Sequence, residues 1–596
     1  MILQGSLQVV GSGALLAVIG KEVMHVFHQG NGNDDGGAAH TDEKHGNEYV
    51  GQTSDDQIQH EIHCTRRRNP RWSARLHAMR LLSLRALCAL LLTSLLQIVI
   101  FPVAGPLPVW RASLSWFATV LLLWLLLVEG RTWSPWKWAA VGYANGVLWY
   151  LGTCYWVYST MNQYGGLPGP VAALVMVLFC LYLGLYHALF AVLLACVRRA
   201  GVAVALIAAP FVWVGVELAR ARITSFPWNL LGYAQVDSYA LTRLAPWSGV
   251  YGISFVLMAV NAAIAAAFVF PRRRVSTVAA MCGAVLAAGV QNVGGWMAPQ
   301  RMAGTQKAVM MQPNLTVGMG EQGDAATLAR NLAGFSLQAA SLDDSPTRIV
   351  LWPEAPSPFY TNKPEFTSVA LQLTEAVHAP LIAGAIGIEA APQDRKGYHV
   401  YNSAGLFLPP QGLVARYDKI HLVPFGEYMP YASLFSFASG LTQAVGLFDR
   451  GSSRMPLGAD GHRYGVFLCY ESIFGDEVRQ FVRNGAEVLT NLSDDGWYGD
   501  SSAPFQHINM ARMRAIENHR WVLRDTNNGI TASIDPNGRV VERMERNQRG
   551  AAAMHFEYLH DLTFYTRFGD VFAFLCAAVG CGFLVFAVMS KRVAID

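Results

Sequence analysis

Long apolar runs fill the first half of the chain and return once near its end. At about 1.5 Å per helical residue, a run of about 20 residues crosses a hydrocarbon core of roughly 30 Å. Eight runs have about this length, and they lie at 82–101, 112–128, 137–157, 171–197, 201–219, 249–270, 275–295 and 571–589. The pattern therefore predicts a polytopic α-helical membrane domain with eight spans.

The segment from 296 to 570 has a different pattern, in which short apolar runs alternate with amphipathic stretches. Six runs are typical of buried strands: KAVMMQ, RIVLWPE, PLIAGAIGI, YGVFLCY, EVLTNLS and GITASIDP. Two stretches have the spacing of helices: AATLARNLAGFSLQAASL and HINMARMRAIENHRWVLR. Strands that alternate with helices predict one sizeable layered α/β domain.

Residues 1–78 fit neither pattern. The stretch HQGNGNDDGGAAH is rich in Gly, Asp and His, a composition that buries too little apolar surface to fold. We expect a disordered extension here, and Met79 is an alternative start. The predicted organisation is an extension at 1–78, a membrane domain with seven helices at 79–295, the α/β domain at 296–569, and the eighth helix with a short tail at 570–596.

Basic residues mark alternate loops between the predicted spans. They include TRRRNPRWSAR before the first span, Arg198 and Arg199 after the fourth, PRRR at 271–274 after the sixth, and Lys591 and Arg592 after the eighth. Because cytoplasmic loops carry an excess of Lys and Arg, these loops are expected in the cytoplasm. Counting spans then places the α/β domain outside the cytoplasm, although Arg220, Arg222 and Arg243 after the fifth span weaken the pattern.

The composition agrees with a membrane protein. Hydrophobic residues make up 53% of the chain and charged residues only 14%, whereas a typical soluble domain has about 25% charged residues. The net charge of +4 is too small to indicate a nucleic-acid partner. The bilayer is therefore the first partner that the sequence predicts.

Three reactive side chains follow predicted strands of the α/β domain. Glu354 ends RIVLWPE, Lys419 lies in ARYDKIHLVPFGEY, and Cys469 ends GVFLC. A free thiol has a pKa of about 8.5 and needs a base to become a thiolate. A carboxylate can take the proton, and a fixed ammonium can stabilise the oxyanion that forms when the thiolate attacks an acyl carbon. The set is chemically sufficient for acyl transfer through a thioester.

Each of the three residues also has a plain structural interpretation. A single cysteine after an apolar strand is often buried and inert. Glu354 could lie in a surface turn, and Lys419 could pair with Asp418 or be solvated. Spacing alone leaves these alternatives open.

Longer motifs around these residues resemble a known family. WPEAP, YDKIHLVPFGEY, CYES and NLSDDGWYGDSSAPFQHINMARMRAIENHRWVLRDTNNGITASIDPNGRVV occur in the order of the nitrilase superfamily. They look like its membrane-bound branch, the bacterial apolipoprotein N-acyltransferases. The resemblance continues into the spans through YWVYSTMNQYGGLPGPVAAL and TSFPWNLLGYAQVD, and it covers about residues 81–592.

The resemblance implies a nitrilase-like four-layer α-β-β-α sandwich on the periplasmic side of the bacterial inner membrane. It implies transfer of an acyl chain from a glycerophospholipid, through a cysteine thioester, to the α-amino group of a lipoprotein's N-terminal diacylglyceryl-cysteine. By motif, Cys469 would be the nucleophile, Glu354 the general base and Lys419 the oxyanion stabiliser. Substrate-site roles would fall to Glu427, Tyr470 and Glu471.

Two further segments are candidates for lipid contact. Residues 429–448 are uncharged and carry Phe435 and Phe437, so they form either a lid that dips into the bilayer or a buried loop of the domain core. SFPWNLLGY at 225–233 carries Trp228 and Tyr233, which are typical of membrane interfaces. These two aromatic residues either anchor the segment or contact substrate.

The chemistry needs no cofactor and no metal. His421, His507 and His519 lack a partner at a ligand spacing, so no metal site is predicted. Near the outer end of the fifth span, Glu217 stands three residues before Arg220, and an ion pair within the helix is the simplest expectation for them.

Two other functions use the same features. A membrane-tethered nitrilase-type amidase would let water attack the thioester of a small amide, but such a substrate needs neither eight spans nor an apolar lid. A transporter with a large binding domain would show charges within several spans and an internal repeat. The predicted spans have few charges and no repeat.

Overall fold

The computed structural model describes residues 82–270, 278, 281–283, 285–286, 288–289, 302–317, 324–342, 344–354, 359–394, 397–428 and 448–590. The extension predicted at 1–78, most of the span predicted at 275–295, and the segment that holds Phe435 and Phe437 lie outside these residues. The chain divides into two units between Cys88 and Ala89, and the contacts discussed below lie within the second unit.

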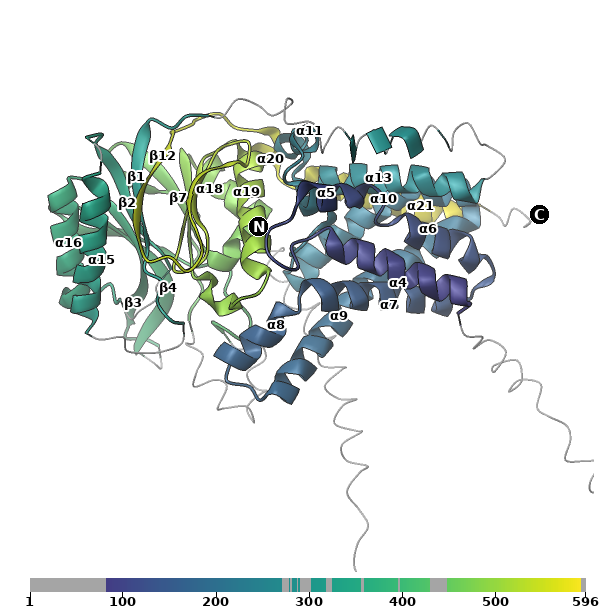
Figure 1. The fold of residues 1–596 in the computed structure, drawn as a ribbon, viewed down its shortest axis with the longest axis horizontal. Helices are drawn as coiled ribbons and strands as arrows, with labels where there is room; N and C mark the ends of the chain where they lie inside the picture. Colours follow the sequence, from purple (N-terminus) through teal and green to yellow (C-terminus); the bar gives the residue numbers. More distant parts are fainter. Residues whose placement is uncertain are drawn as a thin grey trace, which may run out of the picture. The chain divides into compact units, whose positions relative to one another are not determined.

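The first half of the described chain is helical (Figure 1). Its longer helices are α4 (Leu84–Val99), α6 (Val120–Leu127), α7 (Pro135–Thr153), α9 (Gly169–Val197), α10 (Val202–Ala219) and α13 (Val250–Val269), and α21 (Val571–Met589) returns to them at the end of the chain. Helix α10 contacts α9, α13 and α21. This bundle is called the helical half below.

Among the residues that the structure describes, five segments are long and apolar enough to cross a membrane, by length and composition: Val109–Thr132, Gly169–Ala200, Val202–Thr224, Val250–Val269 and Val571–Met589. Two predicted spans are helices that do not meet both criteria. Helix α4 has 16 residues, and α7 is less apolar because it carries Lys137, Asn145 and several glycines. The count of eight spans stays a prediction.

Helices α7 and α9 pack closely because glycines line their contact. A Cβ at Gly142 would lie 2.5 Å from the carbonyl oxygen of His187, and one at Gly146 would lie 2.8 Å from the His187 Cβ. Small residues let helix backbones approach in this way within membranes.

The second half contains two six-stranded sheets. The first has the order β12-β1-β2-β3-β4-β5, with β1 (Gln306–Gln312), β2 (Thr347–Trp352), β3 (Leu381–Ala391), β4 (Gly397–Leu408), β5 (Gly412–Asp418) and β12 (Gly550–Phe556). The second has the order β11-β10-β9-β8-β7-β6, with β6 (Leu457–Ala459), β7 (His462–Leu468), β8 (Val488–Ser493), β9 (Val522–Thr526), β10 (Thr531–Ile534) and β11 (Val540–Met544).

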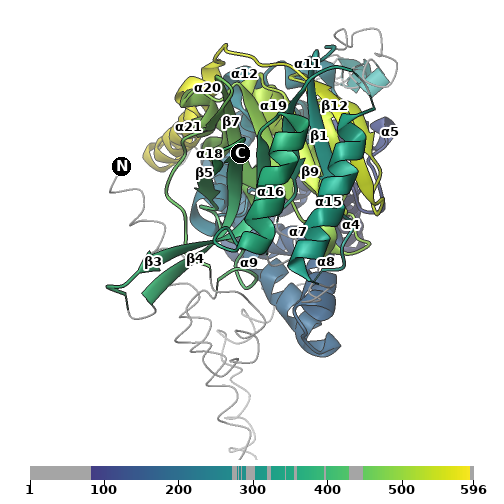
Figure 2. The same ribbon diagram turned by 90° about the vertical axis from the view of Figure 1, so that its left-hand side faces the viewer.

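Side-chain alternation along the strands builds two cores. Ala308 and Met310 join a cluster with residues of the second sheet such as Val466, whereas Val309 and Met311 face a cluster with α15 (Ala325–Ala340) and α16 (Pro364–Val377). Figure 2 shows these two helices lying side by side over the strands. Helices α18 (Gly475–Arg483) and α19 (Ala503–Asn518) contact the second sheet.

One predicted helix ends earlier than expected. The stretch from His507 was predicted to continue as a helix through WVLR, but α19 ends at Asn518 and β9 begins at Val522. His519 takes the left-handed conformation, with φ 49°, which stops the helix. The prediction was wrong because helical periodicity was extended across this break.

Candidate active site

The strand directions bring the reactive residues to one place. Strands β1, β2 and β3 are parallel, and so are β7, β8 and β9. Two antiparallel pairings, β3 with β4 and β4 with β5, return β5 to the direction of β3. The carboxyl ends of β2 and β5 therefore lie at one edge of their sheet, and the Asp494 N–H after β8 donates to Glu354 Oε2 after β2 (3.0 Å).

Lys419 lies between two carboxylates directly after β5. Its Nζ is 2.9 Å from Glu354 Oε1 and 2.8 Å from Glu427 Oε1. The side-chain amide of Asn402 donates to the same two oxygens, at 2.8 and 2.5 Å. Glu427 Oε2 accepts from the Val423 N–H (2.7 Å), so the lysine and both acids are fixed in position.

Burial and charge set the protonation of this cluster. Burial lowers the pKa of Lys419, but Glu354 and Glu427 outweigh it and hold the pKa well above its ordinary value. Burial raises the pKa of Glu354, yet the Lys419 charge and hydrogen bonds from Lys419 and Asn402 bring it below its ordinary value. Glu354 is therefore ionised at neutral pH and can accept a proton.

Cys469 begins the turn that follows β7. Its φ is 44°, a left-handed conformation that residues with a side chain rarely adopt. Its side chain is buried, and the charges of Glu354 and Lys419 act on it. Burial and the Glu354 charge raise the thiol pKa well above its ordinary value, against the opposing charge of Lys419. The resting thiol is therefore protonated and has a base beside it.

Glu471 ties the nucleophile turn to the turn that carries the lysine. Its carboxylate accepts hydrogen bonds from the N–H groups of Leu468 (2.7 Å), Ile420 (2.7 Å) and His421 (3.0 Å), and from the Tyr417 hydroxyl (2.8 Å). A buried carboxylate with four protein donors is stable only if the two turns stay together. This geometry fits a structural role beside the site.

The loop at 225–233 packs against the site from the helical half. Trp228 and Tyr233 are both buried, and Tyr233 accepts a hydrogen bond from Arg514 Nη2 (3.1 Å). The hydroxyl of Tyr470 donates to the Ser225 carbonyl (3.0 Å). Both aromatic residues therefore pack inside the protein, and their contact with substrate stays a prediction.

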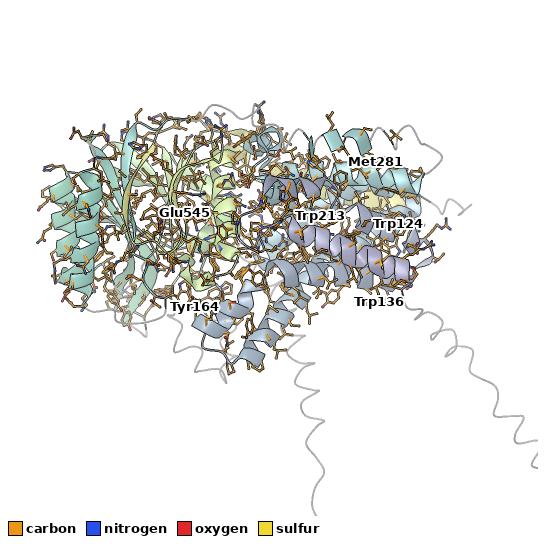
Figure 3. All side chains as sticks on the ribbon, in the orientation of Figure 1. Trp124, Trp136, Tyr164, Trp213, Met281 and Glu545 are labelled. Atoms are coloured by element: carbon orange, nitrogen blue, oxygen red, sulfur yellow. The ribbon has the colours of Figure 1, made fainter. Side chains whose placement is uncertain are left out.

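A second contact between the halves involves Trp497 in the turn after β8. Tyr164, which is labelled in Figure 3, packs edge-on against Trp497 with 5.9 Å between ring centroids. The hydroxyl of Thr160 donates to the Trp497 carbonyl (2.9 Å). Trp497 lies in the turn after β8, shortly after Asp494 and Asp495, so the helical half also contacts this turn.

Sequence reasoning missed a buried polar cluster behind Cys469. His507 Nε2 lies 3.0 Å from the Cys469 carbonyl oxygen, and its Nδ1 lies 2.9 Å from Asp495 Oδ1. Arg524 pairs with Asp495 at 2.7 Å, and burial of Asp495 is outweighed by the Arg524 and His507 charges, which lower the carboxyl pKa. His507 stands 38 residues after Cys469 and 17 residues before Arg524, so no local motif indicates the cluster.

The fold and site define an enzyme class, an α/β domain of the carbon–nitrogen hydrolase type joined to membrane helices. The family model for carbon–nitrogen hydrolase matches residues 308–556, and that for the apolipoprotein N-acyltransferase N-terminal domain matches 86–263. The chain is 32% identical to the apolipoprotein N-acyltransferase of Geobacter metallireducens over 502 residues, which cover 82% of this chain and 92% of that protein.

Two further relatives have the same name. The Nitrosomonas europaea protein is 31% identical over 76% of this chain and 89% of its own, and the Ralstonia nicotianae protein is 31% identical over 76% and 85%. The chain belongs to the apolipoprotein N-acyltransferase family. It is therefore an acyltransferase, as its motifs predicted.

Proposed function

We propose that the protein transfers an acyl chain from a glycerophospholipid, through a thioester on Cys469, to the α-amino group of the N-terminal diacylglyceryl-cysteine of lipoproteins. One observation carries the proposal: Glu354, Lys419 and Cys469 lie in one buried cluster beside a bundle of apolar helices. Both substrates are lipids, and each buried CH₂ contributes about 0.8 kcal/mol to their retention in the bilayer. Such a site has to work at the membrane.

In the first half-reaction Glu354 takes the thiol proton as the sulfur attacks the ester carbonyl of the phospholipid. The Lys419 ammonium stabilises the oxyanion of the tetrahedral intermediate. The intermediate collapses, the carbon–oxygen bond to glycerol breaks, and Glu354 returns the proton to the departing oxygen. A lysophospholipid leaves, and the acyl group remains on Cys469.

In the second half-reaction the lipoprotein amine attacks the thioester carbonyl. Glu354 accepts a proton from the nitrogen, Lys419 again stabilises the oxyanion, and the sulfur leaves with a proton from Glu354. An amide forms, and the free thiol is restored. Because the same carboxylate serves both steps, its fixed position between Lys419 and Cys469 matters in each.

Glu427 and Glu471 support this machinery. We propose that Glu427 holds Lys419 in place, since the ammonium contacts both Glu354 and Glu427, and that Glu471 fixes the two turns. Tyr470 is proposed to line the acyl site next to the nucleophile. Contact of Phe435 and Phe437 with acyl chains stays a prediction of the sequence.

The finer architecture that we propose is eight spans and a four-layer α-β-β-α sandwich on the periplasmic side of the bacterial inner membrane. Five apolar helices and two sheets with helices packed on them support it. We propose the domain boundaries 1–78, 79–295, 296–569 and 570–596. The family-model matches at 86–263 and 308–556 lie within the second and third of these ranges. The partners are a phospholipid donor and a diacylglyceryl-modified lipoprotein acceptor.

The experiment is to incubate purified protein with phospholipid and follow its intact mass, with and without a diacylglyceryl-cysteine peptide. We expect an adduct of fatty-acyl size on Cys469 that persists alone and disappears when the peptide is added. Cys469→Ala should form no adduct and transfer no acyl group while staying folded.

Two results would contradict the proposal. A thioester that decays equally fast without the peptide would favour the amidase that hydrolyses its acyl-enzyme. Acyl transfer at near wild-type rate by Cys469→Ala would show that the nucleophile is another group.

A further inference from the structure

The backbone of Cys469 is held by a side chain from another element. The carbonyl oxygen of Cys469 faces Nε2 of His507 on α19, at 3.0 Å, and His507 is completely buried. A carbonyl oxygen can only accept, so Nε2 carries a proton and donates it. This bond fixes the peptide that directly follows the nucleophile.

The second ring nitrogen of His507, Nδ1, also has fixed partners. Nδ1 lies 3.1 Å from Nη2 of Arg524, which can only donate, so Nδ1 accepts this hydrogen bond. Asp495 Oδ1 lies 2.9 Å from the same ring nitrogen and is itself paired with Arg524. Both ring nitrogens therefore have protein partners, and neither faces the Cys469 thiol as a base would. His507 acts on the backbone of the nucleophile, and the proton chemistry is left to Glu354.

The helical half contacts α19 at Gln506 and His507. The indole of Trp228 stacks on the His507 ring, with centroids 5.7 Å apart and an angle of 16° between the planes. Its N–H donates to Gln506 Oε1 (2.7 Å). Gln506 Nε2 in turn donates to the carbonyls of Pro102 (2.6 Å) and Thr153 (3.0 Å), so residues 506 and 507 are held by the helical half.

We propose that His507 is a positioning residue for the nucleophile, and that Trp228 of the helical half holds it in place. The left-handed backbone of Cys469 is unfavourable for a residue with a side chain. A hydrogen bond to its carbonyl from a clamped imidazole favours this conformation over an ordinary turn. The reactivity of the thiol therefore depends on contact between the two halves.

This inference rests on the proposed role of Cys469 as the nucleophile, so its test includes a measurement that needs no substrate. The first readout is the rate at which phospholipid acylates Cys469. The second is the rate at which iodoacetamide alkylates Cys469, measured by mass spectrometry of its peptide. The third is the thermal midpoint of the purified full chain.

Two amide substitutions form a matched pair at His507. The amide nitrogen of Gln reaches about as far from the backbone as Nε2, so His507→Gln keeps the donor to the Cys469 carbonyl. The amide of Asn reaches only the position of Nδ1, so His507→Asn loses that donor. His507→Phe keeps the ring and its stacking with Trp228 and loses both hydrogen bonds.

We expect His507→Asn and His507→Phe to slow acylation on the order of tenfold to a hundredfold, and His507→Gln to stay within about threefold of wild type. The rate of alkylation of Cys469 should change in the same order, because it depends on the same backbone conformation at Cys469. Thermal midpoints should not follow this order, because all three variants keep the pair between Asp495 and Arg524.

Trp228→Leu tests whether Trp228 holds His507 in place, and Trp521→Phe is its control. Trp521 is an equally buried indole of the α/β domain, and its N–H has no hydrogen-bond partner among the described residues. Both substitutions remove buried aromatic area and should lower the thermal midpoint. Only Trp228→Leu should also slow acylation and alkylation of Cys469.

Three outcomes would overturn the inference. If His507→Phe acylates at wild-type rate, or if His507→Gln is as slow as His507→Asn, the bond to the carbonyl does not position the nucleophile. If Trp521→Phe slows alkylation as much as Trp228→Leu, the effect is general destabilisation. Failure of the proposed function itself would be visible separately, as acyl transfer by Cys469→Ala.

Discussion

The two halves of the molecule bury charged side chains in different ways. Beside Cys469 in the α/β domain, buried cations contact carboxylates: Lys419 contacts Glu354 and Glu427, and Arg524 contacts Asp495. In the helical half, buried Glu217 and Arg220 form no ion pair with each other among the contacts of the described residues, although they stand three positions apart on adjoining helical turns.

The expected ion pair is replaced by bonds to the backbone of one loop. Glu217 Oε1 accepts from the Leu231 N–H (2.7 Å) and from the indole of Trp213 (3.1 Å), which is labelled in Figure 3. Arg220 Nη1 donates to the carbonyls of Trp228 (2.7 Å) and Phe226 (3.2 Å). Irregular backbone near a bilayer needs such internal partners, because lipid offers none.

Buried charges therefore have two uses in this protein. Paired charges in the α/β domain hold an ionised base beside a protonated thiol, which is the state that catalysis needs. Single charges in the helical half hold the loop that carries Trp228. Substitutions of the paired charges in the α/β domain should therefore affect the chemical step. Substitutions of Glu217 or Arg220 should affect the geometry and stability of the loop.

The largest effect is expected at Lys419. Lys419→Ala should slow acylation on the order of a hundredfold or more, the usual loss for one oxyanion donor, and it also leaves Glu354 and Glu427 facing each other. Lys419→Arg should not restore the rate, because a planar guanidinium cannot replace a compact ammonium. The measurement is lysophospholipid release in a single turnover, and a loss below about tenfold would assign the oxyanion to other donors.

A smaller effect is expected at Glu217. Glu217→Leu removes the acceptor of the Leu231 N–H, a loss of about 1–3 kcal/mol for a buried donor left unpaired, so both the thermal midpoint and acylation should fall. Glu217→Gln keeps an acceptor oxygen and should stay close to wild type. If the two variants lose equally, the negative charge matters in itself, and the helical half uses charge as the α/β domain does.

The smallest effect is expected at Asp494, beside the base. Burial raises the pKa of its carboxyl to about 7, so the folded protein holds this proton more tightly than the unfolded chain does. Its contribution to stability is full below about pH 4 and is lost as the pH rises through about 7. Asp494→Asn should flatten the fall in thermal midpoint between pH 5 and pH 8, and an unchanged slope would contradict the assignment.

Much of this protein follows from local pattern. The apolar runs, the strands that end in Glu354 and Cys469, and the motif around Lys419 each lie within a few residues, so the sequence displays them directly. Within the first sheet, the strand directions bring the ends that carry Glu354 and Lys419 to one edge. Packing of the second sheet on the first then brings Cys469 to them. The family resemblance rests on the longer motifs around these residues.

Only the tertiary structure decided how these pieces are held. Lys419 is shared between two acids, the Cys469 carbonyl is bound by His507, and Glu217 and Arg220 bind a loop instead of each other. Each of these contacts joins a side chain to a group placed by another turn or element, and many of the partners are backbone atoms. A backbone carbonyl or N–H is present at nearly every position, so its partner leaves no mark in residue type or spacing.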